Sequence, residues 1–294
     1  MASPQPSPAS PSSPNPEEDE TEEIIQIPQS LPSTIWSLTI PLQIHHSSLP
    51  SSHPPFFILL SRLSYLPLLS PRLSTYFGGL ASTTFYYDSV LLRNLPVGLL
   101  HDLYCFPESS GVGPWKIEVG EGEEWKEDVI GDTFLNSAKE ADYIRNGNAR
   151  GIMGLSKNDV EGVWEGVKDG DWKKWEGVYG KLIRGGGGAG GEKRNCPVRV
   201  YVPGRKEGGE EEEVRGEYRV VQGLVGVRGD KGSVQTLGSA LKSLLPTLFP
   251  SSRDPVLANV ILHGAPVPFR APLEELMREC VYPDGWLNFV VVLL

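Results

Sequence analysis

Lys139 carries a primary amine that could accept an acyl group, and it lies near the middle of the chain, within residues 134–156. A helix over this segment turns by about 100° per residue, which gathers its apolar residues on one side. That side comprises Phe134, Ala138, Ala141 and the stem of Arg145. Lys139 then projects about 140° away from Phe134, toward solvent. On this pattern alone it is an ordinary solvated lysine, so a chemical role needs support from the rest of the chain.

The ends of this helix can be predicted from the flanking residues. Asp132 or Thr133 can serve as the N-cap, because both side chains accept hydrogen bonds from free backbone amides. Asn146 and Gly147 end the helix, since both residue types tolerate the left-handed conformation of a C-terminal cap. The amine of Lys139 is therefore expected on a rigid element between the two halves of the chain.

A thiol is the second candidate for chemistry. The three cysteines, Cys105, Cys196 and Cys280, have no C-x-x-C spacing, which is typical of a reducing compartment and excludes a cysteine-rich zinc site. Cys105 could act as a nucleophile with His101 as its base, since residues four apart share a helix face. No third orienting group or oxyanion motif accompanies them. We interpret Cys105 and Cys196 as small buried hydrophobic residues, and we expect no catalytic residue, metal or cofactor.

The composition limits the possible classes of protein. The chain has 294 residues, of which 39% are hydrophobic, so it can form about two domains with real cores. A net charge of −10 argues against broad nucleic-acid binding. Residues 1–16 lack the basic and apolar regions of a secretory signal, and the apolar run 56–60 is soon followed by Arg62 and Arg72. The sequence predicts a soluble intracellular protein with a disordered Ser/Pro and acidic tail over residues 1–23.

The two halves of the chain show the same order of predicted elements. The first half has strands at 35–40 and 56–60, a helix from Leu66 to about 77, short strands at 85–87 and 90–92, a helix at 95–104 and a strand at 115–119. The second half has strands at 197–202 and 218–221, a helix at 237–245, a strand at 260–262, a helix at 272–280 and a strand at 286–293. This order is typical of the ubiquitin-like β-grasp, in which a mixed sheet wraps one helix.

The segment between the halves is helical in pattern. Ser156 can cap one helix, and a second helix carries an apolar stripe of Trp172, Trp175, Val178, Tyr179 and Leu182. The tryptophans could form an aromatic binding box, but their spacing favours a packed core. The predicted fold class is therefore α+β, with two ubiquitin-like β-grasp domains flanking a helix-rich domain. The expected boundaries are a tail at 1–23, domains at 24–122, 123–184 and 195–294, and a Gly-rich linker at 185–194.

Eight short motifs in this order resemble the autophagy protein 5 family, in its fungal form, over about residues 34–294. They are FILLSRLSYL at 57–66, PVGLLHDL at 96–103, PWKI at 114–117, KEAD at 139–142 with NG at 146–147, WEGV at 164–167, TLG at 236–238, LHG at 262–264 and YPD at 282–284. The chain departs from the family over residues 84–94, where a glycine turn and a Trp-His pair are missing. Residues 185–191 and 210–213 look like insertions.

The resemblance implies that Lys139 accepts the ubiquitin-like modifier autophagy protein 12 through an isopeptide bond. It also implies that the conjugate binds autophagy protein 16 and acts like a ubiquitin ligase. With the conjugating enzymes of autophagy, it would promote transfer of autophagy protein 8 to phosphatidylethanolamine. The expected location is cytoplasmic, with peripheral contact at the preautophagosomal structure membrane.

Isopeptide chemistry places simple demands on such a lysine. Its amine attacks a thioester carried by the conjugating enzyme, so it must be exposed and held on a rigid element. A lysine with a pKa of about 10.4 is protonated at neutral pH, so the enzyme must assist its deprotonation. Glu140 is adjacent but points elsewhere on the helix. The chain is thus expected to be a substrate and scaffold without catalytic residues of its own.

Two further surfaces are expected. A groove for an amphipathic helix of autophagy protein 16 should lie between the domains, where Gly98, Leu99 and Leu100 could offer apolar surface; equally, these residues could pack on their own sheet. The basic pairs Lys173–Lys174 and Arg145–Arg150 could contact a membrane or simply be solvated. The alternative function is a twin ubiquitin-like adaptor that binds partners without being conjugated.

Overall fold

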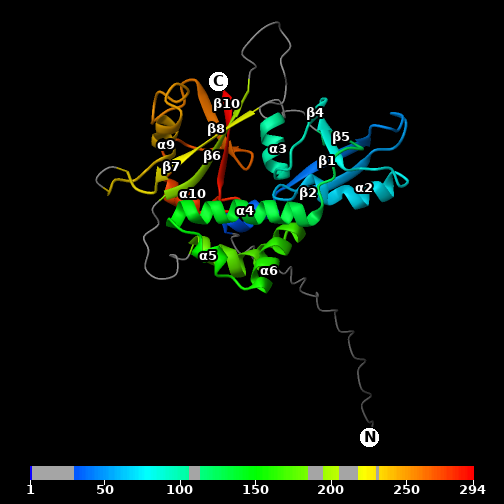
Figure 1. Ribbon diagram of the computed structural model, residues 1–294, viewed down its shortest axis with the longest axis horizontal. Helices are drawn as coiled ribbons and strands as arrows, with labels where there is room; N and C mark the ends of the chain where they lie inside the picture. The colour runs from blue at the N-terminus through cyan, green and yellow to red at the C-terminus, as the bar shows by residue number, and fades with distance from the viewer. Residues whose placement is uncertain (2–29, 106–112, 185–194, 205–217, 230–231) are drawn as a thin grey trace.

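The computed structural model describes residues 1, 30–105, 113–184, 195–204, 218–229 and 232–294. The expected tail at 1–23, the Gly-rich linker and the acidic loop at 210–213 lie outside these residues. Within them, two mixed sheets are joined by a group of helices (Figure 1). The predicted fold class is confirmed: two ubiquitin-like domains flank a helical region.

The two sheets have the same topology. The first has the order β2-β1-β5-β3-β4 and consists of β1 (Thr39–His46), β2 (Phe56–Ser61), β3 (Thr84–Tyr87), β4 (Val90–Leu91) and β5 (Trp115–Gly120). The second has the order β7-β6-β10-β8-β9 and consists of β6 (Asn195–Pro203), β7 (Tyr218–Gly226), β8 (Ala258–Leu262), β9 (Ala265–Pro266) and β10 (Leu287–Leu293). In each sheet the first and last strands pair in parallel at the centre, and the other pairs are antiparallel. The repeated order of elements seen in the sequence is thus a repeated topology.

The helices of each domain pack on its sheet. The first domain has η1 (Leu66–Leu69), α2 (Ser70–Tyr76) and α3 (Val97–Tyr104), and the second has α9 (Leu237–Leu244) and α10 (Leu273–Glu279). Apolar side chains that alternate along β1 and β5 contribute Leu42, Ile44 and Ile117 to the core of the first domain. This burial is the main source of each domain's stability, since alternation gives each strand one apolar face.

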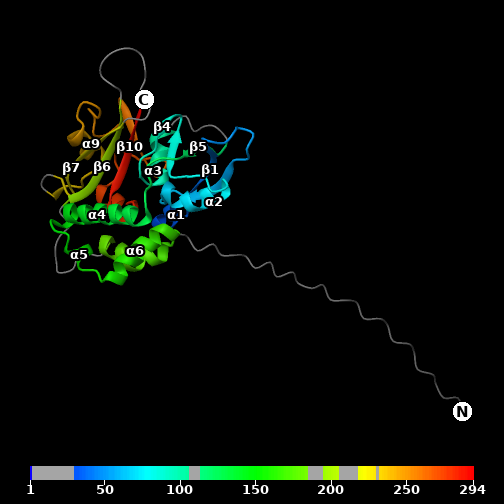
Figure 2. The ribbon, with the colours of Figure 1, turned by 45° about the vertical axis from the view of Figure 1, so that its right-hand side comes forward.

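The helical region consists of α4 (Glu127–Asn146), α5 (Arg150–Met153), α6 (Lys157–Asp169), α7 (Trp172–Trp175), a π-helical turn η3 (Glu176–Gly180) and α8 (Lys181–Arg184). Figures 1 and 2 show α4 running past the lower ends of both sheets, with α5 and α6 on its other side. Gly147 ends α4 in the left-handed conformation, with φ 73°, as predicted. The side chain of Ser156 caps α6, also as predicted.

Two predicted element boundaries are wrong. The strand expected at 35–40 is a helix up to Ser37, α1 (Leu31–Ser37), because Ser30 caps it and Pro32 sits in its first turn. Helix α4 begins at Glu127, six residues before Thr133, and Lys126 occupies its N-cap. This additional turn buries Ile130, which is only 1% exposed. Asp132 and Thr133 are therefore exposed residues inside the helix rather than its cap.

Candidate functional site

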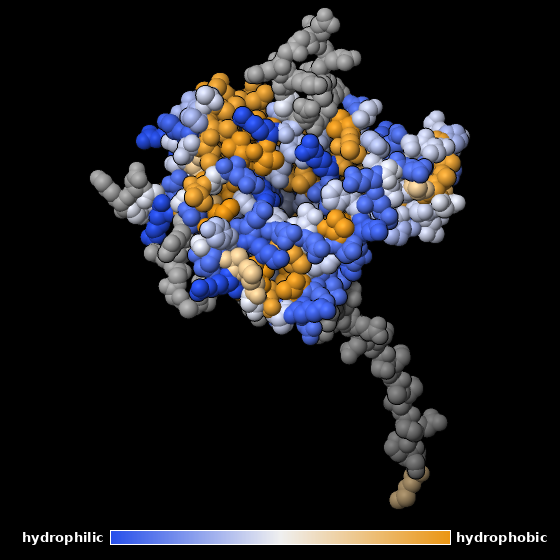
Figure 3. Space-filling model, in the orientation of Figure 1, coloured by the Kyte–Doolittle hydropathy of each residue, from blue (hydrophilic) through white to orange (hydrophobic). Residues whose placement is uncertain are grey.

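Lys139 lies on the exposed face of α4. Its Nζ atom is 3.3 Å from the amide oxygen of Asn136, which is also exposed. The opposite side of the helix is buried, since Ala138 and Ala141 have no exposed surface and Phe134 is 3% exposed. Figure 3 shows mainly hydrophilic residues over α4 in this view. The predicted orientation of Lys139 is therefore what the structure shows.

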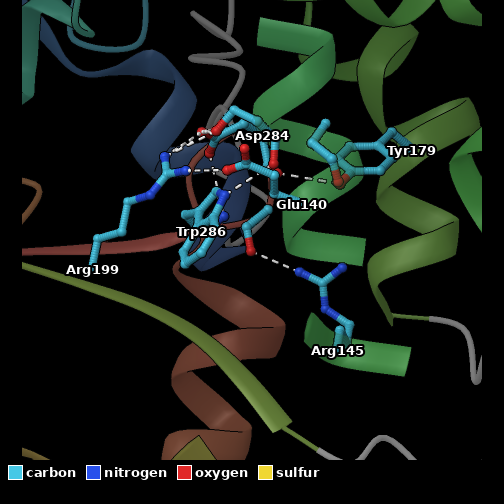
Figure 4. Close-up of polar contacts among 9 residues, drawn as sticks. Glu140, Arg145, Tyr179, Arg199, Asp284 and Trp286 are labelled. Carbon is cyan, nitrogen blue, oxygen red and sulfur yellow. Dashed lines mark hydrogen bonds and ion pairs between the residues drawn. The ribbon is translucent and has the colours of Figure 1, made fainter. Parts of the chain in front are cut away.

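A single arginine of the second domain contacts the residues on either side of Lys139. Arg199 on β6 donates from Nη1 to Ser137 Oγ at 2.9 Å and from Nη2 to Glu140 Oε2 at 3.0 Å (Figure 4). Its guanidinium lies 3.8 Å from the ring centroid of Trp286, in cation–π geometry. The turn of α4 that carries Lys139 is thereby attached to the second sheet.

The loop 282–286 makes further contacts with the same turn. Asp284 Oδ2 accepts a hydrogen bond from Ser137 Oγ at 2.7 Å, and Trp286 Nε1 donates to the carbonyl of Ser137 at 3.0 Å. About two turns later, Arg145 donates to the carbonyl of Gly285 at 2.7 Å. Together, these residues and Arg199 form what we call the α4 clamp: Ser137, Glu140, Arg145, Arg199, Asp284, Gly285 and Trp286.

The helical region supports this loop from behind. Trp175 Nε1 donates to the carbonyl of Pro283 at 3.0 Å. Tyr179, within the π-helical turn, donates to the carbonyls of Asp284 at 3.2 Å and Ala138 at 3.3 Å. Trp175 and Tyr179, four residues apart in the chain, thus bind neighbouring carbonyls of one loop.

Gly285 is required by the geometry of the loop. It has φ 85°, a conformation that side chains rarely adopt, and a Cβ atom there would lie 2.9 Å from both Arg145 Nη2 and Tyr179 Oη. The loop can approach α4 this closely only because the residue has no side chain.

Burial dominates the electrostatics of the clamp. It raises the pKa of Asp284, while Arg199, Ser137 and the amide of Trp286 act in the opposite direction. A buried carboxylate is costly unless it is paired and hydrogen-bonded, and here it is both. Of the contacts that lower the pKa of Asp284 and so favour its charged form, the one with Arg199 acts most strongly.

The described residues next to Lys139 are engaged in structural contacts. Glu140, its neighbour, is engaged by Arg199. Among the residues that the structure describes, no group of three potential metal ligands occurs. The arrangement can present an amine on a helix that is fixed in place.

Family comparisons cover most of the chain. Models of the domains of autophagy protein ATG5 match it in three parts: the UblA domain at residues 35–120, the alpha-helical bundle region at 127–185 and the UblB domain at 195–291. The chain belongs to the autophagy protein 5 family. Its relatives include autophagy protein 5 of Chaetomium globosum, 52% identical over 90% of both chains. Another is autophagy-related protein 5 of Neurospora crassa, 50% identical over 91% of this chain and 72% of that protein.

A solved structure supports the same fold. The crystal structure of Kluyveromyces marxianus Atg5 matches with a TM-score of 0.69 and 21% identity, covering 89% of this chain and 99% of the other. The first ubiquitin-like domain is hereafter called UblA and the second UblB. The membership makes this an autophagy protein, and the clamp joins its helical region to UblB.

The structure places Gly98, Leu99 and Leu100 in the interior. Leu99 and Leu100 have no exposed surface, and a Cβ atom on Gly98 would lie 2.8–2.9 Å from Arg62. Leu100 thus packs in the core of UblA, as in the alternative interpretation, whereas Leu99 packs in the core shared with the helical region and UblB. Neither leucine offers exposed apolar surface to a partner. A small pocket of about 10 Å³ instead lies between α1, α7 and α10, and Trp36, Trp172 and Trp175 are among the residues that line it.

The basic residues expected at a membrane are not all on the surface. Arg145 is 1% exposed and belongs to the clamp, so it cannot face a membrane. Lys174 forms an ion pair with Glu165. Lys173 and Arg150 remain exposed. No described helix is long and apolar enough to cross a bilayer.

Cys105 and His101 do not form an exposed catalytic pair. Cys105 is 7% exposed and caps the end of α3. The ring of His101 packs edge-on against Trp115 and lies 3.8 Å from Asp102, whose carboxylate is bound by Arg62 and by the amide of Gly264. The structure supports the interpretation of Cys105 as a buried hydrophobic residue.

Sequence reasoning missed Arg199 and Trp286 as parts of this site. Arg199 was one polar residue of an alternating strand, and Trp286 was the start of an apolar one. The YPD motif at 282–284, next to a glycine, was the one available signal that this loop has a special conformation.

Proposed function

We propose that this protein is the acceptor of the ubiquitin-like modifier autophagy protein 12, joined through an isopeptide bond to Lys139. The conjugate would bind autophagy protein 16 and act like a ubiquitin ligase, promoting transfer of autophagy protein 8 to phosphatidylethanolamine. The chain itself would supply the acceptor amine and a scaffold, with catalysis left to the conjugating enzymes.

The observation that carries this proposal is the setting of Lys139. Its amine is exposed, while the backbone of the same turn is held by UblB and by the helical region. An amine that attacks a thioester gains from such positioning, because orientation converts a loose encounter into a near-intramolecular reaction. Lys139 needs no local base if the conjugating enzyme provides one.

The experiment is reconstitution of the full chain with the modifier and its two conjugation enzymes. Wild type should form one covalent adduct, seen as a shifted band, and Lys139→Arg should form none. Lys126→Arg and Lys157→Arg are matched controls, since both lysines are exposed at or near the helical region, and both variants should keep the adduct. An undiminished adduct in Lys139→Arg would exclude this lysine. No adduct with wild type would favour the unconjugated adaptor.

We propose that the helix of autophagy protein 16 packs over the small pocket between α1, α7 and α10. These elements come from the segment before UblA, the helical region and UblB, so one amphipathic helix there would contact all three. In a pull-down with that helix, Trp172→Glu should abolish binding. Leu224→Glu, which alters a 76% exposed residue of β7, should not. Equal binding by both variants would show that the helix binds at another surface.

The proposed location is the cytoplasm, with peripheral contact at the preautophagosomal structure membrane. Of the basic residues considered, Lys173 and Arg150 are the exposed ones. Binding of the chain to vesicles containing anionic lipid should weaken in the Lys173→Glu, Arg150→Glu double variant, since each basic residue near such a surface contributes about 1 kcal/mol. Unchanged binding would exclude this surface.

A further inference from the structure

A second polar site lies behind the α4 clamp, where UblA, α4 and UblB meet. A cavity of about 80 Å³ opens there between Asn94 and Leu95 of UblA, Thr133 and Ser137 of α4, and Asn288 of UblB. Figure 3 shows a hollow between the two sheet domains above α4. The cavity adjoins the clamp, since Arg199 and Asp284 also line it.

Several buried polar atoms at this cavity have no hydrogen-bonding partner among the described residues. They are Asn94 Nδ2, Asn94 Oδ1, Asn288 Oδ1 and Arg199 Nε. Asn288 is 3% exposed, so bulk solvent does not reach it freely. Such atoms are costly to bury unless a bound molecule completes their hydrogen bonds.

The lining determines which kind of molecule fits. A cation would need more than one carboxylate, but Asp284 is the only one here and already accepts from Ser137 and the amide of Trp286. An anion would need an uncompensated cation, but the charge of Arg199, the one cationic residue that lines the cavity, is balanced by Glu140 at 3.0 Å and Asp284 at 3.7 Å. The remaining atoms include both donors and acceptors, which suits a small neutral molecule that can donate and accept.

We propose that this cavity binds a cluster of water molecules that bridges Asn94 of UblA to Asn288 and Arg199 of UblB. Its volume is sufficient for several waters, because about 10–15 Å³ of such space holds one. The waters would join the two ubiquitin-like domains at α4, whereas elsewhere the domains touch directly, through the Gly264 amide and Asp102 at 2.9 Å. Bridging waters are nearly as favourable as direct hydrogen bonds.

The direction in which Asn94→Leu changes Tm tests whether the cavity holds water. In a hydrated cavity, Asn94→Leu removes partners from the waters, and Tm should fall by about 2–4 °C. In a dry cavity, the same change removes two unsatisfied polar atoms, and Tm should rise. Asn195→Leu sets the scale, because the Asn195 side chain donates to the carbonyl of Ile144 and its loss should lower Tm in either case. An unchanged or raised Tm for Asn94→Leu would overturn the proposal.

A crystal structure of the wild-type chain provides the second measurement, independent of any variant. Water peaks within hydrogen-bonding distance of both Asn94 and Asn288 would support the bridge. A dry cavity, or density for a molecule larger than water, would overturn it even if Asn94→Leu failed to fold.

Discussion

Replacing Arg199 by leucine should weaken both the fold and the presentation of Lys139. The change removes hydrogen bonds to Ser137 and Glu140 and the contact with Trp286 at 3.8 Å. It also leaves Asp284, whose side chain is 12% exposed, without its cation. Breaking a buried pair in this way costs about 3–5 kcal/mol. The loss of unfolding free energy should lie near the lower end of this range. Burial already raises the pKa of Asp284, so the unpaired carboxylate can take up a proton more easily.

The contribution of Glu140 to this effect should be small. Its side chain is 63% exposed, so its ion pair with Arg199 contributes about 0–1 kcal/mol. Glu140→Gln is therefore the matched control, since it removes one contact of Arg199 and leaves the buried ones. The buried pair with Asp284, rather than the ion pair next to Lys139, should carry most of the stability.

Urea unfolding of Arg199→Leu, Asp284→Asn and the double variant measures this directly. The free energies of unfolding should not add: the double variant should be more stable than the sum of the two losses predicts, because the uncompensated charge is gone. The rate of adduct formation by Arg199→Leu should fall even in conditions where the chain remains folded. Additive losses, or a loss below about 1 kcal/mol for Arg199→Leu, would refute the clamp as we describe it.

Three further predictions follow from the same structure. Gly285→Ala should lower the free energy of unfolding by at least about 1 kcal/mol, measured in urea, since the residue combines φ 85° with contacts at 2.9 Å; an unchanged midpoint would contradict this. Burial lowers the pKa of His263 from 6.5 to about 4, so the unfolded chain takes up a proton at higher pH than the folded one. Stability should therefore fall by up to about 3 kcal/mol between pH 6.5 and pH 4, and the fall should be smaller in His263→Gln, while equal slopes would contradict it. In the Lys139→Arg background, Asn136→Lys should restore some adduct in reconstitution, because residue 136 is the exposed neighbour one turn earlier, whereas Ser137→Lys should not, because it lies in the clamp.

Local patterns in the sequence were sufficient to predict those helices whose ends are fixed by nearby residues. Gly147 ends α4 and Ser156 caps α6, since both signals act within one turn. The aromatic stripe of the helical region is a packed core as predicted: Trp172 and Trp175 stack with ring centroids 5.4 Å apart. The repeated order of strands and helices was visible because alternation and helical spacing are themselves local.

Features that depend on distant partners could not be read from the sequence. Ile35 and Trp36 look like part of a strand, but Trp36 packs on Trp175, 139 positions later, with ring centroids 5.1 Å apart, and the segment is helical. Arg145 looks like a surface charge, but the carbonyl of Gly285 binds it in the interior. In both cases a contact between distant segments adds to the local signals, and the sequence does not show which distant residue supplies that contact.

The faces of α4 explain why the amine of Lys139 lies where it does. One face, with Phe134, Ala138, Ala141 and Arg145, is buried. A second face, with Ser137 and Glu140, is bound by Arg199 of UblB. What remains is a stripe at spacings of four, three and four residues, Asp132, Asn136, Lys139 and Tyr143, and all four are exposed. Lys139 therefore lies on the stripe that the packing leaves free, in a turn whose other residues contact UblB. Exposure of the amine and rigidity of its backbone have the same origin, because the contacts that fix the turn use the neighbouring face of the helix.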